Sequence, residues 1–298
     1  MGARMSIYAV EKEIERFLNT SEPEVICIRG KWGVGKTYGW NAFLESAKIN
    51  NSLKLNTYAY VSLFGVGSLE RLKYSVFENR VERDGIGIEP NVETFKTNTS
   101  AVIKRLGLKS LGLITSLPGA RNYASAFESL AFLSISETII CIDDLERKGV
   151  GLSMKDVMGL TSYLKEQKKC KVVLIFNDGE LDGTDKTDFK QYTEKVVDAS
   201  LLFEPNPEDC VKIAVTEPGK THDLLRNALI TLGISNIRII KKIERLVLRV
   251  SPLLSEFEQQ VQFQAVHSLT LLGWCHYSGD GAPSIEFVLK SNGNEIYR

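Results

Sequence analysis

The sequence predicts an α/β fold in which a parallel sheet is covered by helices on both faces. Short apolar segments alternate with segments of helical periodicity along the first two thirds of the chain. The apolar segments are bounded by glycine, proline or polar residues, as strands are. Several are apolar at every position, which is typical of strands with both faces covered. This alternation therefore favours a parallel α/β sheet.

The charge of the chain is balanced, which excludes two classes of protein. The 298 residues include 37 Lys+Arg and 37 Asp+Glu, and 43% of them are hydrophobic. Residues 1–150 carry 19 basic and 17 acidic side chains, so the balance also holds within each half. The chain as a whole is therefore neither a strongly basic nucleic-acid binder nor a protein with an acidic tail.

The spacing of the cysteines and the length of the apolar runs indicate the cellular compartment of the protein. The five cysteines are far apart and form no C-x-x-C pair, so neither a disulfide framework nor a zinc site is indicated. The N-terminus lacks the apolar core of a signal peptide, and no run reaches the roughly 18 apolar residues of a membrane span. We expect a cytoplasmic protein, with peripheral membrane attachment as the alternative.

The N-terminal part predicts a helix, a strand and a second helix. Residues 6–19 place apolar side chains at helical spacing. Pro23 separates this helix from the apolar segment 25–28, which leads into a glycine-rich turn. A helix is expected from about residue 36 to residue 47.

The next part predicts a second strand and an insert. The strand is expected at 57–64 and a helix at 68–83, for which Ser68 is a suitable N-cap. Residues 84–100 have the composition of a loop. A mostly helical insert is expected over 101–133. Together with the last residues of the preceding loop, the insert spans about 94–133.

Two more strands and a helix complete the expected sheet. The most apolar strand is 138–142, and the next is 171–176. Between them a helix is expected over 153–167, with Ser153 as N-cap and Asp156 at the position of a capping box.

The character of the sequence changes near Pro205. Residues 208–272 have no strand-like segment and are expected to form several helices. We therefore expect an α/β core over 1–204 and a smaller helical domain over 205–272. Residues 273–298 are expected to be the start of a further element, a β-hairpin, and the chain to be a fragment of a longer protein.

A glycine-rich motif follows the first strand and opens the second helix. It fits G-x-x-x-x-G-K-[ST], the P-loop, in the strand–loop–helix context that the motif requires. Glycines let successive backbone N–H groups converge on phosphate oxygens, and the helix N-terminus adds positive potential. The lysine would reach the β- and γ-phosphates, and the hydroxyl of Thr37 would bind Mg²⁺. The residues expected to bind the nucleotide are Gly30, Lys31, Trp32, Gly33, Val34, Gly35, Lys36 and Thr37.

The apolar segment 138–142 is expected to be the matching Walker B strand. It delivers Asp143, which would hold Mg²⁺ through the water shell of the metal. The second acid, Asp144, would polarise the attacking water, with Glu146 as the alternative base. An acidic helix N-cap after a core strand would give the same pattern.

Asn177 ends the next apolar strand. A polar side chain at this place would orient the water and sense the γ-phosphate, although Asn-Asp-Gly is also a favourable turn sequence. The chain contains no N-K-x-D tetrapeptide, which disfavours a GTPase.

These motifs resemble the KAP family of P-loop NTPases, within the wider class of AAA+ and STAND ATPases. The specific points are the tryptophan in G-x-W-G-x-G-K-T and the run 143–147, DDLER, which is similar to the family's D-D-L-[DE]-R. Segments 60–65 and 192–205 are similar to those of some bacterial members. The resemblance covers about residues 6–250. It implies an ATP-binding core with a helical lid, often in antiphage or membrane-associated systems.

The resemblance also implies roles for two arginines. The run 236–241, NIRIIK, is similar to the family's N-x-R-x-[ILV]-K helix, so Arg238 would sense the γ-phosphate from the lid. A solvated helix face is the alternative for this arginine. Arg147 would either act on the nucleotide of a neighbouring subunit or pair with nearby acids.

The predicted insert departs from family members that carry transmembrane helices at this place. Its best apolar stretch, 106–117, contains Lys109 and three polar residues, so it cannot span a bilayer. Residues 94–127 contain five bases and no acid. Such a segment would contact an anionic membrane, nucleic acid or a partner protein, or would simply be a helix with a solvated basic face.

The sequence thus predicts a Mg²⁺-dependent ATPase that couples the state of the γ-phosphate to conformational change or assembly, with antiphage defence as its role by resemblance. ATP and Mg²⁺ are the expected cofactors, and self-association or a partner protein is expected. Three alternatives stay open. They are a regulatory ATP-binding switch or scaffold without turnover, a small-molecule phosphotransferase, and a motor attached to membrane or nucleic acid through the basic insert.

Overall fold

The computed structural model describes residues 7–88, 94, 96–100, 131–177, 179–181, 183–278 and 281–290. Most of the predicted insert, with four of its five bases, lies outside these residues. The chain divides into two compact units. The first comprises Met1–Lys31 and Lys36–Phe203, and the second comprises Trp32–Gly35 and Glu204–Arg298.

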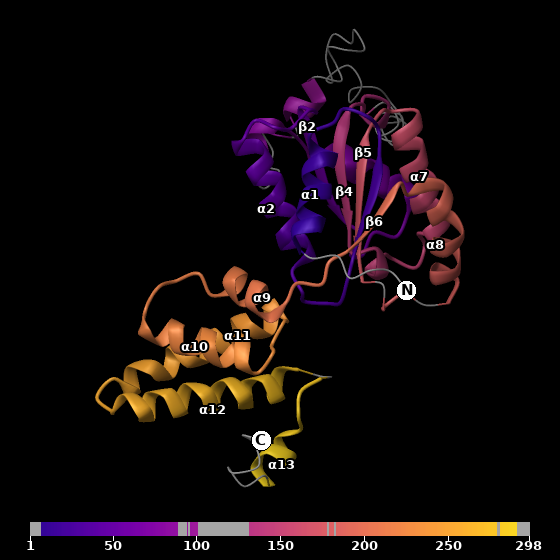
Figure 1. Cartoon of the computed structure of the whole chain (residues 1–298). Coiled ribbons are helices and arrows are strands. Elements are labelled where there is room, and N and C mark those ends of the chain that lie inside the picture. The colour runs from indigo at the N-terminus through magenta and orange to yellow at the C-terminus, as the bar shows by residue number, and fades with distance from the viewer. Residues whose placement is uncertain are drawn as a thin grey trace, which may run out of the picture. The chain divides into compact units, whose positions relative to one another are not determined.

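The first unit is built on a six-stranded sheet of order β3-β2-β4-β5-β1-β6 (Figure 1). Five strands are parallel, and β3 pairs antiparallel with β2 at one edge. Every residue of β4 and β5 is buried because both strands lie inside the sheet. The strands are β1 Val25–Arg29, β2 Thr57–Ser62, β3 Arg80–Glu82, β4 Thr138–Asp143, β5 Lys171–Phe176 and β6 Ala199–Leu202.

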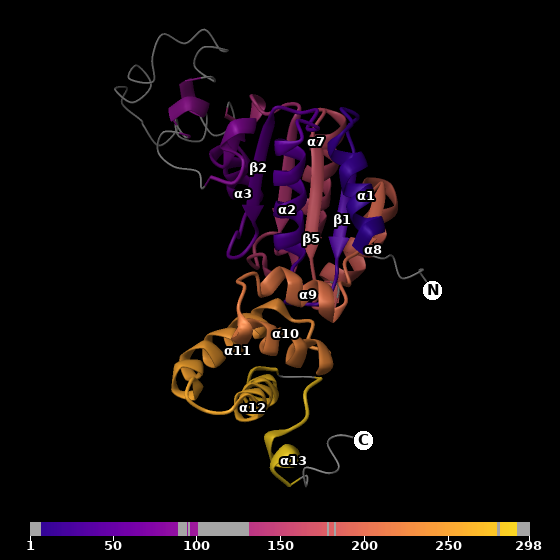
Figure 2. The ribbon, with the colours of Figure 1, turned by 60° about the vertical axis from the view of Figure 1, so that its left-hand side comes forward.

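Helices cover both faces of this sheet, as the sequence predicts (Figure 2). On one face, Trp40 of α2 donates a hydrogen bond from Nε1 to the Tyr58 hydroxyl of β2 at 3.0 Å and contacts Phe17 of α1. On the other face, α3, α7 and α8 share a core with the strands, including Val76, Val157 and Val196. The helices are α1 Ile7–Leu18, α2 Lys36–Ile49, α3 Leu69–Glu78, α7 Met154–Glu166 and α8 Gly183–Val196.

Helix α7 begins at the capping box that the sequence predicts. The hydroxyl of Ser153 accepts the N–H of Asp156 at 3.1 Å, and the Asp156 carboxylate accepts the N–H of Ser153 at 3.3 Å. Two N–H groups that a helix start leaves without intrahelical partners are thereby satisfied.

The region after α3 differs from the prediction. The helix expected over 68–83 ends at Glu78, and Arg80–Glu82 form the antiparallel strand β3. The amide of Asn98 donates to the carbonyl oxygens of Phe77 and Arg80 at 3.2 and 2.7 Å, which satisfies the groups freed at this junction. Residues 96–100, which lie in both the expected loop 84–100 and the expected helical insert 94–133, are helical. These contacts join segments that are distant in sequence, so local periodicity does not reveal them.

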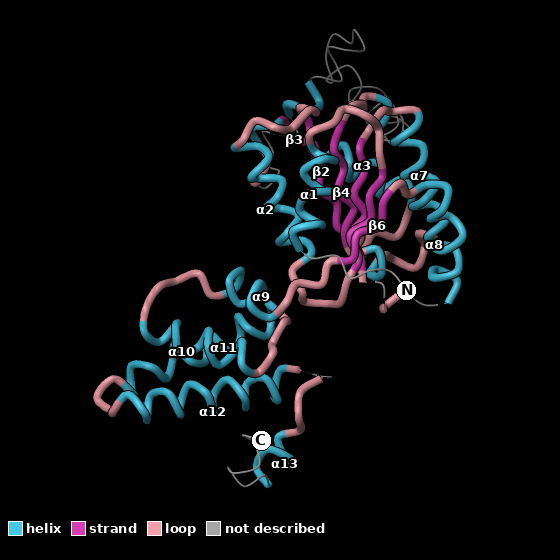
Figure 3. The backbone as a smooth tube through the Cα atoms, viewed as in Figure 1, coloured by secondary structure: helices cyan, strands magenta, loops and turns pink. Residues whose placement is uncertain are grey.

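The second unit is helical in its described part (Figure 3). Helix α9 begins with Asn206 as N-cap and Pro207 in its first turn. Val211, Leu229 and Ile243 are among the buried residues that α9, α10 and α11 contribute to the core of this unit. The helices are α9 Pro207–Ala214, α10 Lys220–Thr231, α11 Ile237–Val250, α12 Gln259–Tyr277 and α13 Ile285–Lys290.

The β-hairpin expected in the last residues is wrong where the structure describes them. Helix α12 continues to Tyr277, past the expected boundary at residue 272, and Ile285–Lys290 form α13. The hydroxyl of Ser284 accepts the N–H of Phe287 at 3.1 Å, which starts a helix in place of a strand.

Among the described residues, no helix combines the length and the apolar character needed to cross a membrane. The apolar stretch 106–117 lies outside those residues.

We predict that Ser153→Ala lowers the free energy of unfolding by about 1 kcal/mol, because it removes the side-chain acceptor of the α7 capping box. The control is Ser162→Ala in the same helix. It removes a surface hydrogen bond to Glu166 of 2.8 Å but gains helix propensity, so stability should change by no more than a few tenths of a kcal/mol. Denaturant unfolding of both variants tests this, and equal stabilities would contradict it.

Candidate functional site

The glycine-rich loop, residues 30–37, joins the end of β1 to the start of α2. Gly33 and Gly35 have φ angles of +81° and +92°, a region that side chains other than glycine rarely adopt. The Lys36 ammonium donates to the carbonyl oxygens of Gly30 and Lys31, both at 2.9 Å. The buried Lys36 therefore lies inside the curl of the loop.

Gly30 is required for a different reason, the close approach of another segment. A Cβ on this residue would lie 2.4 Å from the carbonyl oxygen of Phe203, just after β6. No such contact is tolerated, so the first glycine of the motif lets β6 pass directly beside the loop.

The middle of the loop, Trp32–Gly35, belongs to the second compact unit. Within that unit, the N–H of Ile237 donates to the Gly33 carbonyl at 2.8 Å, and the Asn236 amide donates to the Trp32 carbonyl at 3.3 Å. The Arg238 guanidinium lies 5.1 Å from the centre of the Trp32 ring. The N-terminus of α11 is therefore hydrogen-bonded to the loop, and Arg238 is held beside it.

Asp143, at the end of β4, is the most constrained carboxylate of the site. Its Oδ2 accepts hydrogen bonds from the Thr37 hydroxyl at 2.6 Å and the Tyr60 hydroxyl at 3.0 Å. Its Oδ1 accepts the N–H of Asp144 at 2.7 Å. Burial raises the pKa of Asp143, and the hydrogen bond from Thr37 opposes that rise. The charged form is thus held by donors in a place that disfavours charge.

The residues at this point fit Mg²⁺. Thr37 and Asp143 offer hard oxygen ligands that converge on one place, and such ligands suit this ion. In the described part of the chain, no three His, Cys, Asp or Glu residues form a group able to hold a metal on their own. This is the pattern of an ion bound by one or two protein oxygens together with substrate phosphates.

Asp144 follows with an unusual backbone. Its φ and ψ of 59° and 41° are left-handed, a conformation that costs free energy in a non-glycine residue. The Ser62 hydroxyl donates to its Oδ2 at 2.7 Å, and a guanidinium nitrogen of Arg147 lies 3.6 Å from its Oδ1. The Arg147 guanidinium also lies 3.9 Å from the centre of the exposed Phe64 ring. Of the two predicted roles for Arg147, the structure therefore shows pairing with a nearby acid.

Glu146 and Asn177 are joined by a hydrogen bond. The N–H of Asn177 donates to Glu146 Oε2 at 3.2 Å. Burial raises the pKa of Glu146, and that hydrogen bond and the charge of Lys36 are among the effects that oppose the rise. Asn177 is buried just after β5, so its backbone N–H meets the Glu146 carboxylate, which lies near the Lys36 charge.

The structure thus brings Lys36, Thr37, Asp143 and Asp144 to one edge of the sheet in the first unit. The sequence analysis missed Tyr60 and Ser62 as site residues, although both lie in a strand that it predicted. The signal that could have found them is their alternate spacing on β2, which places both on one face of the strand, at the end paired with Asp143.

The family model described as "KAP family P-loop domain" matches residues 9–209, about two thirds of the chain. A search of curated proteins gave no match.

Solved structures resemble the chain at low sequence identity. The Drosophila ORC bound to DNA is 12% identical, with a TM-score of 0.45, and the match covers 87% of this chain and 58% of that one. The Walker-type ATPase PABY2304 of Pyrococcus abyssi is 15% identical, with a TM-score of 0.43 and coverages of 91% and 74%. Domain III of DnaA from Thermotoga maritima is 12% identical, with a TM-score of 0.44 and coverages of 88% and 89%. The chain thus spans less than two thirds of the ORC chain that it matches.

We predict that Gly30→Ala lowers the free energy of unfolding by about 1–3 kcal/mol, because the new Cβ would overlap the Phe203 carbonyl. The control is Gly159→Ala, on an exposed face of α7 with open space around it, which should raise stability by up to about 1 kcal/mol. Urea unfolding measures both changes. A Gly30→Ala protein as stable as the wild type would show that β6 can move away from the loop.

We also predict that Asp143→Asn raises the melting temperature of the protein at pH 7 in the presence of a chelator, because it removes a charge that burial disfavours. Burial raises the pKa of the Asp143 carboxyl in the folded protein, so its protonated form favours folding. This contribution to the free energy of unfolding is complete below the pKa of the unfolded chain, and it is lost as the pH rises through the pKa of the folded protein. The stabilising effect of the substitution should therefore shrink as the pH is lowered toward 4. Thermal unfolding at several pH values tests this, and a destabilised variant at pH 7 would contradict it.

Proposed function

The chain belongs to the KAP family of P-loop NTPases, and on this premise we propose that it binds ATP with Mg²⁺ and hydrolyses the bond between the β- and γ-phosphates. The observation that carries the proposal is the 2.6 Å contact between Thr37 and Asp143, beside a loop with the Lys36 ammonium inside it. A glycine-rich loop, an ammonium group and two hard oxygen groups lie at one place, and this supports the proposal.

The loop and α2 would bind the phosphate groups. Backbone N–H groups of the loop and the N-terminus of α2 supply partial positive charge. Lys36 exchanges its contacts with loop carbonyls for contacts with phosphate oxygens, at small cost because the ammonium already lies inside the curl. These groups stabilise the charge that develops on the transferred phosphoryl group, which is the main source of rate in this reaction class.

Thr37 and Asp143 would hold Mg²⁺ at the edge of this loop. When bound, the ion neutralises charge on the β- and γ-phosphate oxygens. The hydroxyl of Thr37 and the carboxylate of Asp143 need only small rotations to serve it, because they already meet.

Asp144 would accept the proton of the attacking water, with Glu146 as the second candidate. The left-handed backbone at Asp144 directs its carboxylate away from the line of β4, and residues held in such strained conformations cluster at active sites. Asn177 would orient the water from the end of β5. Arg238 would sense the γ-phosphate from α11, since the loop and that helix share hydrogen bonds.

The output would be a conformational change or assembly. Trp32–Gly35 and α11 belong to one compact unit, whereas Lys36 and Thr37 belong to the other, so the loop is continuous with both. A change in the loop on loss of the γ-phosphate would therefore reach the C-terminal helices directly. By family resemblance, the biological role that we propose is bacterial antiphage defence.

One observation favours a second candidate, a nucleotide-dependent switch with little turnover. The carboxylate of Asp144 is bonded to Ser62 and lies beside the Arg147 guanidinium. Both contacts engage the carboxylate oxygens that would otherwise face an attacking water. A protein that keeps this arrangement with ATP bound would hold the nucleotide without hydrolysing it.

We predict Mg²⁺-dependent release of phosphate from ATP by the wild-type chain, and a loss of roughly a hundredfold or more in turnover for Lys36→Ala and for Asp144→Asn. The two variants should differ in binding. Lys36→Ala should weaken ATP binding strongly because it removes a phosphate contact, whereas Asp144→Asn should bind ATP within a few-fold of the wild type. Phosphate release and equilibrium binding measure the two effects.

Other results would reassign the roles. Tight ATP binding by the wild type, with phosphate release that neither substitution changes, would favour the switch. Turnover that survives Asp144→Asn but is lost in Glu146→Gln would make Glu146 the base.

A further inference from the structure

Tyr60 is a polar residue of the site that belongs neither to the glycine-rich loop nor to the acidic motif. Its hydroxyl donates to Asp143 Oδ2 at 3.0 Å, the same oxygen that accepts from Thr37 at 2.6 Å. A buried carboxylate beside phosphates needs donors that hold its orientation, because two of its rotamers would turn the oxygens away from the ion.

The strand register fixes this contact. In the parallel pairing of β2 with β4, Ser62 lies opposite Asp143, and Tyr60 lies opposite Cys141. Directly paired residues project to the same face of a sheet, and so do residues two apart on one strand. Tyr60 and Asp143 are therefore diagonal neighbours on the face that α2 covers, within the reach of an aromatic side chain.

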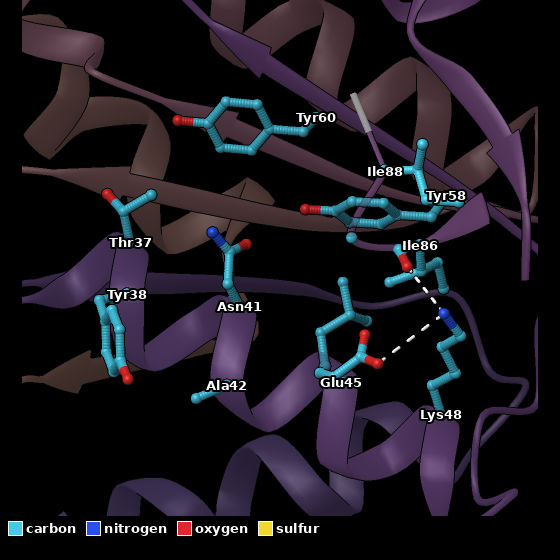
Figure 4. Close-up of a pocket in the computed structure, with 12 residues that line it drawn as sticks. Thr37, Tyr38, Asn41, Ala42, Glu45, Lys48, Tyr58, Tyr60, Ile86 and Ile88 are labelled. Carbon is cyan, nitrogen blue, oxygen red and sulfur yellow. Dashed lines mark hydrogen bonds and ion pairs between the residues drawn. The ribbon is translucent and has the colours of Figure 1, made fainter. Parts of the chain in front are cut away.

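The ring of Tyr60 also lines a cavity of about 910 Å³ between α2 and β2 (Figure 4). Thr37 and Tyr60 lie at one end of it, and Lys48 lies at the other. Among the residues that the structure describes, this side of the half-buried ring borders the cavity and not a packed neighbour. The hydrogen bond to Asp143 is therefore what ties the hydroxyl to the site.

The hydroxyl groups of Thr37 and Tyr60, which both donate to Asp143 Oδ2, would change differently when Mg²⁺ and a nucleotide bind. The hydroxyl of Thr37 is itself expected to become a ligand, so its donation to Asp143 must weaken. Among the described residues, Tyr60 is the other side chain with a hydrogen bond to this carboxylate. It can keep that bond because it lies on β2, outside the loop.

We propose that Tyr60 is a positioning residue that holds Asp143 in the orientation that binds Mg²⁺. This inference rests on the proposed function. It adds a third element, strand β2, to a metal site otherwise built from α2 and β4.

The test compares Tyr60→Phe with Tyr58→Phe. Both substitutions remove one hydroxyl from β2, on the same face and in the same cavity. The hydroxyl of Tyr58 accepts from Trp40 and has no contact with Asp143. The measured quantity is the Mg²⁺ concentration that half-saturates binding of a fluorescent, non-hydrolysable ATP analogue. Binding without Mg²⁺ and the melting temperature with a chelator are measured in parallel.

For Tyr60→Phe we expect a rise of roughly tenfold in the half-saturating Mg²⁺ concentration, as for loss of a hydrogen bond to a charged group. Its affinity for the analogue without Mg²⁺ should equal that of the wild type. For Tyr58→Phe we expect a lower melting temperature, because Trp40 Nε1 loses its acceptor, and an unchanged Mg²⁺ requirement. A residue with a purely structural role would lower the melting temperature without this selective effect on Mg²⁺.

Equal Mg²⁺ requirements in Tyr60→Phe and the wild type would overturn the proposal. Failure of Tyr60→Phe to fold, while Tyr58→Phe folds, would also overturn it, because the hydroxyl would then be structural. Failure of the proposed function looks different. In that case the wild-type chain would bind no analogue at any Mg²⁺ concentration, and the positioning role of Tyr60 would be rejected together with the proposed function.

Discussion

The hydrogen bond between Thr37 and Asp143 is the contact on which the rest of the site depends. It joins the first turn of α2 to the last residue of β4, and the two are separated by 106 positions in sequence. The parallel sheet brings both to one edge, because the strands next to the loop all end there. Asp144, Glu146 and Asn177 take their places from the same edge, so an error in register between β4 and its neighbours would move all of them.

This arrangement has a cost in stability that only function explains. A carboxylate is buried where burial disfavours its charge, and the next residue is held in a left-handed conformation. The glycine-rich loop keeps three residues without side chains where a Cβ would meet a neighbouring segment. The apolar strands and the two covering layers of helices supply the stability that offsets these features.

Much of the fold and of the candidate site was predictable from sequence, because the signals for these parts are local. The strands β1, β4 and β5 are apolar runs next to turn residues, and the loop motif carries its own spacing. The residues Lys36, Thr37 and Asp143 follow from those motifs. What could not be predicted depends on contacts between distant segments. Strand β3 exists because it pairs with β2, and Tyr60 reaches the site only through the register of β2 with β4. The helix in the last residues is a different case, because its cap at Ser284 is a local signal that the β-hairpin prediction overlooked.

The division of the glycine-rich loop between two compact units has a consequence for the order of folding. The hydrogen bond from Asn236 to Trp32 joins residues 204 positions apart, so it can form only after nearly four fifths of the chain has been synthesised. A ribosome-bound chain that ends near residue 203 carries every strand of the sheet but lacks the helix that completes the loop. Contacts of such high sequence separation are among the last to form. The glycine-rich loop therefore gains its last hydrogen bonds only in a chain that already includes α11.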